Sequence, residues 1–304
     1  MENEKFAAFV ITFERPVILL ETLSILKKQT FPPQHILIID NSISDRTEIA
    51  LKEHISDSLE YYRVGYNSGP AGGARIGLEK LANLGYDWIY WGDDNNPPRD
   101  YNVFQETFKA LREYVNDAQM PGIFGGKGGK LNKTTGRVRS LSNKMLRANK
   151  FAEVDVIPGG HTMLVNSGVV TAGCLPDEKL FFGFEEMDFC LSVKKAGFKL
   201  IVDSETWLKV RRRDNHLKEN YRWQDASFGR EEILNRDYYS TRNLLYIFLK
   251  NKLYSAFIVL LLKSVAKILL GFKYGWKYGK AMAGVQFSAL GDFFSGKFGK
   301  QRDL

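Results

Sequence analysis

The sequence predicts an α/β fold with a mostly parallel sheet, and three observations support this prediction. Apolar runs of strand length alternate, in the first third of the chain, with segments whose apolar residues recur at helical spacing. Polar residues, several of them carboxylates, directly follow the apolar runs. Strands that alternate with helices form a parallel sheet with right-handed connections, and ligands bind beyond the carboxyl ends of its strands.

The first elements follow one another in the expected order. Residues 6–13 form an apolar run that ends at Glu-Arg-Pro, and Pro16 suits the first position of a helix. Residues 36–39 predict a second strand, which carries Asp40 at its end. Another helix and a third strand come next.

A glycine-rich segment, residues 67–77, leads into the following helix. The chain lacks the dinucleotide-binding motif, because Glu-Arg-Pro follows the first strand at the place where G-x-G-x-x-G would stand. The segment 67–77 is not a Walker loop either, because it contains no Gly-Lys-Ser/Thr. Gly69, Gly72 and Gly73 have a purely structural alternative, which is close packing of a helix against the sheet.

The fourth strand carries the main candidate site. The apolar run 88–91 breaks at Gly92 into Asp93 and Asp94, and Asn-Asn-Pro-Pro follows. A strand that ends in this way delivers carboxylates to the crevice where ligands bind. Mg²⁺ is a hard cation that takes one or two protein carboxylates together with substrate phosphates. The alternative is a plain polar turn, since Asp, Asn and Pro are favoured turn residues.

Three segments, taken in order, resemble the family 2 glycosyltransferases, which have a GT-A fold. They read VITFERPVILLETLSILKKQTFPPQHILIIDNSISD, NSGPAGGARIG and DWIYWGDDNNPP. Within that family the similarity is to bacterial rhamnosyl- and galactofuranosyltransferases, and it covers about the first 245 residues. The segment NRDYYSTRNLLYIFLKN resembles the end of the catalytic unit in such proteins, with Tyr239, Arg242 and Asn243 matching.

The resemblance implies roles for residues of the donor site. Thr12 and Arg15 would line the nucleoside pocket, and Asp40 would bind the base or the ribose. The remaining donor-site residues would lie in the loop flanking the diphosphate or at the metal, and they are Asn67, Gly69, Arg75, Asp93 and Asp94.

The middle of the chain contains a glycine-rich run, PGIFGGKGGK, and a basic run, KTTGRVRS. We expect a mobile, solvated loop here, the alternative being that Lys127 and its basic neighbours cover the donor phosphates. Residues 151–158 predict a strand, after which come Gly160 and His161. A single histidine beside a strand is more often a packing residue, but the resemblance implies that this segment lies under the donor sugar and contacts the substrate.

A second acidic group, Glu185, Glu186 and Asp188, begins the helix that follows a phenylalanine-rich run. The helix dipole stabilises acids in a first turn, which explains one acid better than three beside phenylalanines. Partial burial would raise a carboxylate's pKa and make it a usable general base. The resemblance implies that the second acid, Glu186, takes the proton from the acceptor hydroxyl, with Glu185 and Asp188 as supports. The family more often has Asp at that position.

Two departures from the family pattern concern the divalent cation, Mg²⁺ or Mn²⁺, that the resemblance implies. The first acid of the usual motif is replaced by Gly92, which leaves Asp93 and Asp94 as metal ligands. Family members also often place a histidine after the strand that follows the acidic helix. We expect that strand over residues 200–210, and the nearest histidine is His216. Either His216 completes the metal site, or the neighbouring arginines partly replace the cation at the leaving diphosphate.

The composition is that of an ordinary globular protein with a basic excess. The chain has 304 residues, of which 44% are hydrophobic and 26% charged. The formal charge of +8 lies mostly in the C-terminal part, which points to an anionic partner, either nucleic acid or a membrane surface. Cys174 and Cys190 have no CxxC spacing, so we expect no zinc site, no disulfide framework and a reducing compartment. The acidic N-terminus predicts a first strand rather than a signal peptide.

The C-terminal tail, residues 244–304, combines lysines with aliphatic and aromatic residues. Its longest apolar run, residues 255–262, is shorter than the roughly 20 residues that span a bilayer. We therefore expect amphipathic helices in a membrane interface, on the cytoplasmic face of the cell membrane. The alternatives are helices packed on the catalytic domain or on a second subunit, and a nucleic-acid surface, for which the sequence offers no motif.

Together these observations predict three parts: a nucleotide-sugar-binding half over residues 1–98, an acceptor half over residues 99–243, and the basic tail. The predicted function is inverting transfer of rhamnose, galactofuranose or a similar sugar from a nucleoside-diphosphate sugar to a hydroxyl of a lipid-linked or cell-surface glycan. One alternative is a nucleotidyltransferase, in which the second acidic group has no task. Another is a catalytically degenerate sugar-nucleotide-binding or membrane scaffold protein, which Gly92 and the missing histidine would favour. A homo-oligomer is compatible with the sequence.

Overall fold

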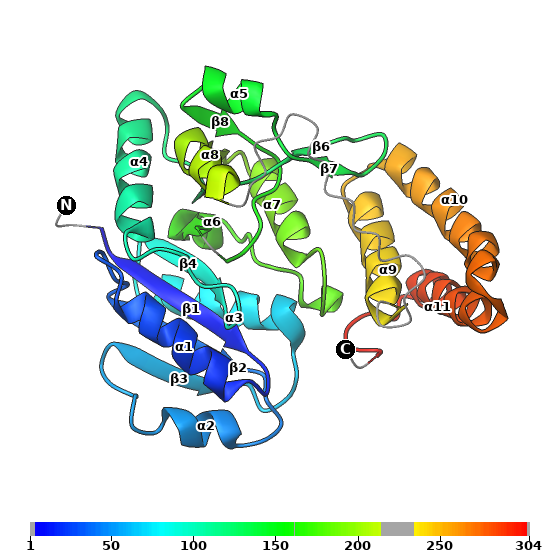
Figure 1. Ribbon diagram of the computed structural model, residues 1–304, viewed down its shortest axis with the longest axis horizontal. Coiled ribbons are helices and arrows are strands. Elements are labelled where there is room, and N and C mark those ends of the chain that lie inside the picture. The colour runs from blue at the N-terminus through cyan, green and yellow to red at the C-terminus, as the bar shows by residue number, and fades with distance from the viewer. Residues whose placement is uncertain (1–3, 161, 214–233, 303–304) are drawn as a thin grey trace.

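A computed structural model describes residues 4–160, 162–213 and 234–302 of the chain. In this part, an eight-stranded sheet with the order β3-β2-β1-β4-β9-β5-β10-β8 forms the centre, and helices cover both of its faces (Figure 1). The strands are β1 (Phe6–Thr12), β2 (His35–Asp40), β3 (Leu59–Arg63), β4 (Trp88–Asp93), β5 (Ile123–Gly125), β8 (Phe151–Glu153), β9 (Leu164–Asn166) and β10 (Leu200–Asp203). Strand β9 runs antiparallel to β4 and β5, and β8 antiparallel to β10, while the other four pairings are parallel. The predicted fold class is therefore confirmed.

The remaining elements are helices and one small hairpin, β6 (Lys130–Leu131) with β7 (Val138–Arg139). The helices of the first half are α1 (Pro16–Lys27), α2 (Arg46–Leu51), α3 (Gly69–Asn83), α4 (Val103–Asp117) and α5 (Asn143–Ala148). Those of the second half are α6 (Ser167–Thr171), η1 (Glu178–Leu180), α7 (Glu185–Lys195), α8 (Ser204–Arg213), α9 (Leu234–Lys250), α10 (Tyr254–Gly271), η3 (Phe272–Tyr274) and α11 (Trp276–Phe294).

Strand β1 lies inside the core, and its alternate side chains face two helical layers. Phe6, Ala8 and Val10 belong to a buried cluster with residues of α1 and α4. Phe9 and Ile11 belong to a second cluster, with residues of α3 and α7. A Cβ added at Gly73 or Gly77 in α3 would meet these two β1 side chains, so the packing alternative holds for Gly73, whereas a Cβ at Gly69 or Gly72 would meet Phe181 or Ser68 instead.

The first half of the glycine-rich run 121–130 is not the solvated loop that we expected. Ile123 and Phe124 are fully buried in β5, in the middle of the sheet. Gly125 and Gly126 follow directly, and a Cβ at either would press on Ile157 or Thr162. The glycines therefore serve close packing in the sheet rather than mobility.

The strand expected over residues 200–210 is also wrong beyond Asp203. The Asp203 carboxylate accepts hydrogen bonds from the backbone N–H groups of Glu205 (3.3 Å) and Thr206 (2.9 Å). A side chain that satisfies the first free N–H groups in this way starts a helix, here α8. The strand expected over residues 151–158 is shorter too, since β8 ends at Glu153.

The three C-terminal helices α9, α10 and α11 pack together on the side of the molecule beyond α7 (Figure 1). The predicted boundary after residue 243 falls within α9, and the division of the chain into three parts stays a prediction. The expectation that no stretch of the tail is long enough to cross a bilayer is wrong by length and composition. Residues 254–274 form one helical stretch of 21 residues with a mean hydropathy of 2.0, and 17% of its most apolar window is buried.

Candidate active site

The ends of β1 and β4 bring Thr12, Arg15 and Asp94 together. Thr12 Oγ1 donates a hydrogen bond of 2.8 Å to Asp94 Oδ2, and Arg15 Nε lies 3.4 Å from the same oxygen. Asp94 is 1% exposed. Burial raises the pKa of Asp94, while the Thr12 hydroxyl and the Arg15 charge oppose that rise. Asp94 is thus a buried carboxylate held by the residues that follow β1.

Asp40, at the end of β2, is fully buried and has partners on both carboxylate oxygens. Its Oδ1 accepts from the Ser42 backbone N–H (2.8 Å), and its Oδ2 accepts from the Tyr61 hydroxyl (2.9 Å). In this structure the side chain joins β2 to the next loop and to β3. Its predicted contact with the base or ribose stays a prediction.

The loop at Asn67 and Gly69 reaches toward the segment that precedes α7. Asn67 Oδ1 accepts from the Gly69 backbone N–H at 3.0 Å, and Gly69 has φ of +70°. A Cβ at Gly69 would collide with the carbonyl of Phe181, which also accepts a hydrogen bond from the backbone N–H of Ala71 (3.2 Å). The donor-side loop is therefore tied to the acidic helix. Arg75 lies farther along α3 and is partly buried.

Asp93 ends β4 and faces the acids of α7. Burial, then the charge of Glu186 and then that of Asp94 raise the pKa of Asp93 to about 7, while Arg15 opposes the shift. Gly159, whose N–H donates to Glu186 Oε1 at 3.2 Å, also lies against the Trp91 ring of β4. The structure therefore brings together two acidic groups that lie far apart in the sequence.

Glu185 and Glu186 experience different surroundings although they are neighbours in α7. Glu185 is 7% exposed, and its Oε2 has no hydrogen-bond partner within the part of the chain that the structure describes. Burial, followed by the Glu186 charge, raises its pKa well above the ordinary value. Burial also raises the pKa of Glu186, but the Gly159 N–H, which donates to its Oε1 at 3.2 Å, and the charge of Lys127 oppose the rise. Of the two, Glu186 has the environment that favours the ionised form.

Two glycines let the loop before β9 approach this cluster. A Cβ at Gly159 would meet the Trp91 ring and Glu186 Oε1. Gly160 has φ of +72°, and its N–H donates to the Trp91 carbonyl at 2.9 Å. The predicted substrate residue Gly160 thus lies beside β4 and the acids. The predicted His161 and His216 lie outside the described residues.

Asp188 projects from α7 toward α9 and away from this cluster. It is 1% exposed, and its Oδ2 accepts from Lys250 Nζ at 2.7 Å. Lys250 also bonds Asp177 at 3.1 Å. Glu185 and Glu186 therefore share the site with Asp93, whereas Asp188 takes part in a salt bridge with the C-terminal helices.

The motif residues of α9 hold the segment before α7 in place. Asn243 Nδ2 donates to the carbonyls of Leu180, Phe182 and Gly183 at 2.9–3.1 Å. Arg242 is fully buried and donates to the carbonyls of Leu180 and Gly299. These bonds satisfy backbone groups that no sheet or helix uses, and they fix where the first turn of α7 begins.

The carboxylates at the end of β4 fit a divalent cation that is completed by a substrate. Negative charge from Glu186 and Asp94 already disfavours ionisation of Asp93, and a bound cation would relieve that repulsion. Among the described residues, no three His, Cys, Asp or Glu side chains converge as a ready ligand set. Asp93 and Asp94 therefore suit an ion whose other ligands are phosphate oxygens, as is common for Mg²⁺.

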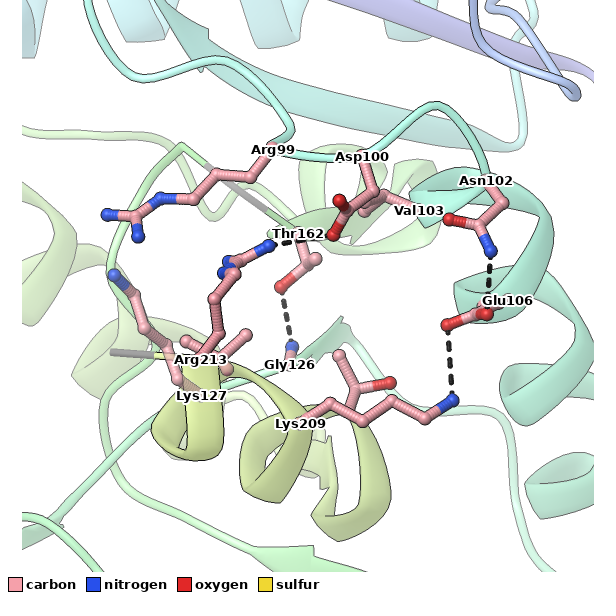
Figure 2. Close-up of a pocket in the computed structure, with 12 residues that line it drawn as sticks. Arg99, Asp100, Asn102, Val103, Glu106, Gly126, Lys127, Thr162, Lys209 and Arg213 are labelled. Carbon is pink, nitrogen blue, oxygen red and sulfur yellow. Dashed lines mark hydrogen bonds and ion pairs between the residues drawn. The ribbon is translucent and has the colours of Figure 1, made fainter. Parts of the chain in front are cut away.

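Sequence reasoning missed the position of Lys127 and gave no role to Arg99. Both line a cavity, together with Arg213 of α8 (Figure 2). Lys127 directly follows the β5 glycines, so it occupies the same place at a strand's end as the acids after β4. The Ile-Phe pair before those glycines was the signal that could have identified the strand.

Known proteins resemble this chain in sequence and in fold. Residues 7–170 match the sequence model described as "Glycosyl transferase family 2". The "Galactofuranosyltransferase GlfT1" of Mycobacterium tuberculosis (strain ATCC 25618 / H37Rv) is 29% identical over 115 residues, which are 37% of this chain and 37% of that protein. The protein of the same name from Mycolicibacterium smegmatis is 23% identical over 211 residues, 64% of this chain and 67% of that one. The matched region is thus little more than a third of the M. tuberculosis protein and two thirds of the other.

A solved structure shows the same fold at low sequence identity. Residues 1–349 of TarS from S. aureus, crystallised in complex with UDP, superpose with a TM-score of 0.51 and 13% identity. The match covers 99% of this chain and 94% of that one, so it includes the C-terminal helices as well as the sheet.

Proposed function

This chain belongs to glycosyl transferase family 2, and we propose that it is an inverting, nucleotide-sugar-dependent glycosyltransferase. The family expected from the sequence is confirmed. The observation that carries the proposed activity is the meeting of Asp93, at the end of β4, with Glu185 and Glu186 of α7 at one edge of the sheet.

The proposed reaction uses Glu186 as the general base. An acceptor hydroxyl gives its proton to the Glu186 carboxylate and attacks the anomeric carbon from the face opposite the diphosphate, whose bond to the sugar breaks. The neighbouring Glu185, with its pKa raised well above the ordinary value by burial and by Glu186, stays protonated and adds no second negative charge. Lys127 and the Gly159 N–H oppose the rise that burial causes in the pKa of Glu186, which favours its ionised form for the step.

The donor would lie over β1, β2 and β4. Thr12, Arg15 and Asp94 already form one connected group there, and the Gly69 loop lies between them and α7. A divalent cation held by Asp93 and Asp94 would supply positive charge to the leaving diphosphate. The names of the two mycobacterial relatives make UDP-galactofuranose the first donor to test, with dTDP-rhamnose as the second.

A thermal-shift panel of UDP-, dTDP- and GDP-sugars tests the proposal on the full chain. One nucleotide class should raise the melting temperature, by an amount that grows with the logarithm of its concentration above the Kd, since binding to the native state stabilises it. Asp94→Asn should remove that shift, whereas the exposed Lys133→Gln should keep it. A panel in which no nucleotide sugar stabilises the protein would contradict the proposal.

We also propose that α10 rests on the cytoplasmic face of a membrane. Ile258, Leu262, Val265 and Leu269 recur at helical spacing and are 52–68% exposed, so they form one apolar stripe. From residue 253 to residue 300 the only acid is Asp292, whereas lysines are frequent. An apolar stripe among lysines suits a surface with anionic lipids.

Sedimentation with vesicles containing anionic lipid tests this surface. The unmodified chain should sediment, salt should weaken the association, and Leu262→Glu with Leu269→Glu should abolish it. Ile49→Glu, at an equally exposed apolar residue of α2, is the control. Protein that resists release by both salt and alkaline carbonate would instead indicate a membrane-spanning α10.

A further inference from the structure

A cavity of about 150 Å³ lies where the start of α4, the end of β5 and α8 meet. Four separate segments line it: the loop that leads into α4 with the first turn of that helix, the residues after β5, Thr162 before β9, and one side of α8 (Figure 2). Four basic side chains belong to this lining: Arg99, Lys127, Lys209 and Arg213. The cavity has room for a phosphate or diphosphate group.

The acids of the cavity are engaged by two of these basic residues. Arg213 lies 2.7 Å from Asp100, and Lys209 lies 3.4 Å from Glu106. With four basic and two acidic side chains, the lining has a net positive charge. Figure 2 shows the charged ends of Arg99 and Lys127 on the same side of the cavity, and the Arg213 guanidinium between them and Asp100, to which it is bonded. The N-terminus of α4, at Val103, adds positive potential from its backbone N–H groups.

The cavity also has a definite position relative to the predicted substrates. Strands β4, β5 and β10 run parallel, so their carboxyl ends meet at one edge of the sheet. Thr12 and Arg15 of the donor side follow β1, whereas the cavity lies at the ends of β5 and β10, beyond β4 and β9. Lys127 lines the cavity and also acts electrostatically on Glu186. Lys127 thus links the cavity to the proposed base, and the cavity lies on the far side of β4 from β1.

We propose that this cavity is a subsite for a phosphate or diphosphate group carried by the acceptor. The acceptor would then be a phosphorylated molecule, with its anionic group among Arg99, Lys127 and Arg213 and its hydroxyl at Glu186. Bonds from guanidinium and ammonium groups to phosphate are charge-assisted and stronger than neutral hydrogen bonds. This inference rests on the proposed function, since it gives that reaction the class of its second substrate.

The test uses inorganic phosphate, pyrophosphate and UDP as probes on the full chain. Calorimetry should show that Arg99→Gln and Lys127→Gln each weaken binding of phosphate or pyrophosphate by about tenfold, because each loses a charge-assisted contact. The same variants should bind UDP within about twofold of the unmodified protein. Lys133→Gln, which removes one exposed positive charge elsewhere, should bind both probes normally, and melting curves check that every variant is folded.

Three outcomes would overturn the inference. Phosphate affinity that is equal in all variants would mean that the cavity is no anion site. A parallel loss of UDP and phosphate affinity in Arg99→Gln would assign the cavity to the donor's diphosphate. Phosphate binding that depends on Arg99, in a protein that binds no nucleotide sugar, would refute the proposed function and the acceptor assignment while leaving an anion site in the cavity.

Discussion

Glu186 and Asp188 lie two residues apart in α7 but face opposite parts of the molecule. Glu186 turns toward the loop at Gly159, and its charge, with that of Asp94, raises the pKa of Asp93. Asp188 turns toward α9, where Lys250 bonds its carboxylate at 2.7 Å. Burial raises the pKa of both acids, and each has a lysine that opposes the rise, Lys127 for Glu186 and Lys250 for Asp188.

This difference separates a carboxylate available for chemistry from one that joins two helices. A buried acid that is bonded to a lysine is held in place by that partner. Removing the lysine leaves a buried carboxylate without a partner and lowers the stability of the fold. Buried acids that repel one another lower the stability of the folded state, and their raised pKa values suit proton transfer or cation binding. The following changes test this contrast, from the largest expected effect to the smallest.

Glu186→Gln should lower sugar transfer by about 10²–10⁴-fold, because a positioned general base contributes on that scale. Its melting temperature should not fall, since the substitution removes one charge from a crowded acid cluster. Asp188→Asn should keep transfer within about tenfold of the unmodified rate. Release of the nucleoside diphosphate measures both. Equal losses of activity in two folded variants would show that the two faces of α7 do not differ in this way.

Gly69→Ala should destabilise the fold by about 2–4 kcal/mol, from the strain of positive φ and from the collision with the Phe181 carbonyl. Gly65→Ala is the matched control. Gly65 has φ of +86° but nothing within 4 Å of an added Cβ, so only about 1 kcal/mol of backbone strain is expected there. Urea unfolding measures both variants. Equal losses would mean that the contact between the donor loop and the segment before α7 contributes nothing.

Lys250→Met should destabilise the fold by about 1–3 kcal/mol, because it leaves the Asp188 carboxylate buried without its donor. The partial exposure of Lys250 keeps the effect below that of a fully buried pair. Adding Asp188→Asn to Lys250→Met should restore part of the loss in urea unfolding. A double variant no more stable than Lys250→Met would show that Asp188 and Lys250 do not interact.

Asp93→Asn should raise the melting temperature more at pH 8 than at pH 5. The folded-state pKa of Asp93 is about 7, above its ordinary value of 3.8, so the folded chain holds a proton that the unfolded chain releases between these values. The contribution of protonated Asp93 to the free energy of unfolding is therefore fully present below about pH 4 and is lost as the pH rises through 7. We expect a gain of about 2–4 °C at pH 8 in metal-free buffer. The exposed Asp57→Asn should give the same small change at both pH values.

Much of the donor half could be predicted because its signals are local. Pro16 begins α1, as expected, and Asp40 and Asp93 end buried strands. The errors came where a local signal has two explanations. Glycines after Ile123 and Phe124 suggested a loop, but neighbouring side chains press against them in the sheet. The run after Asp203 suggested a longer strand, but that carboxylate caps a helix.

The roles of the acids show a different limit. From the sequence, Glu185, Glu186 and Asp188 form one group, and no pattern tells which of them meets Asp93. The direction in which each points depends on how α7 is rotated between the sheet and α9, and the bonds from Asn243 to the segment before α7 help to set that rotation. Lys127 and Arg99 line the same cavity only because the carboxyl ends of β4 and β5 lie at one edge of the sheet.

Chain order and residue spacing were therefore sufficient for the α/β class, for the family resemblance and for the residues that end the strands, since these depend on neighbours along the chain. Folding in three dimensions assigned Glu186 to the acid cluster, Asp188 to Lys250, and Arg99 and Lys127 to one cavity. The physical reason is that electrostatic environment and burial come from residues distant in the sequence, and only packing makes them neighbours.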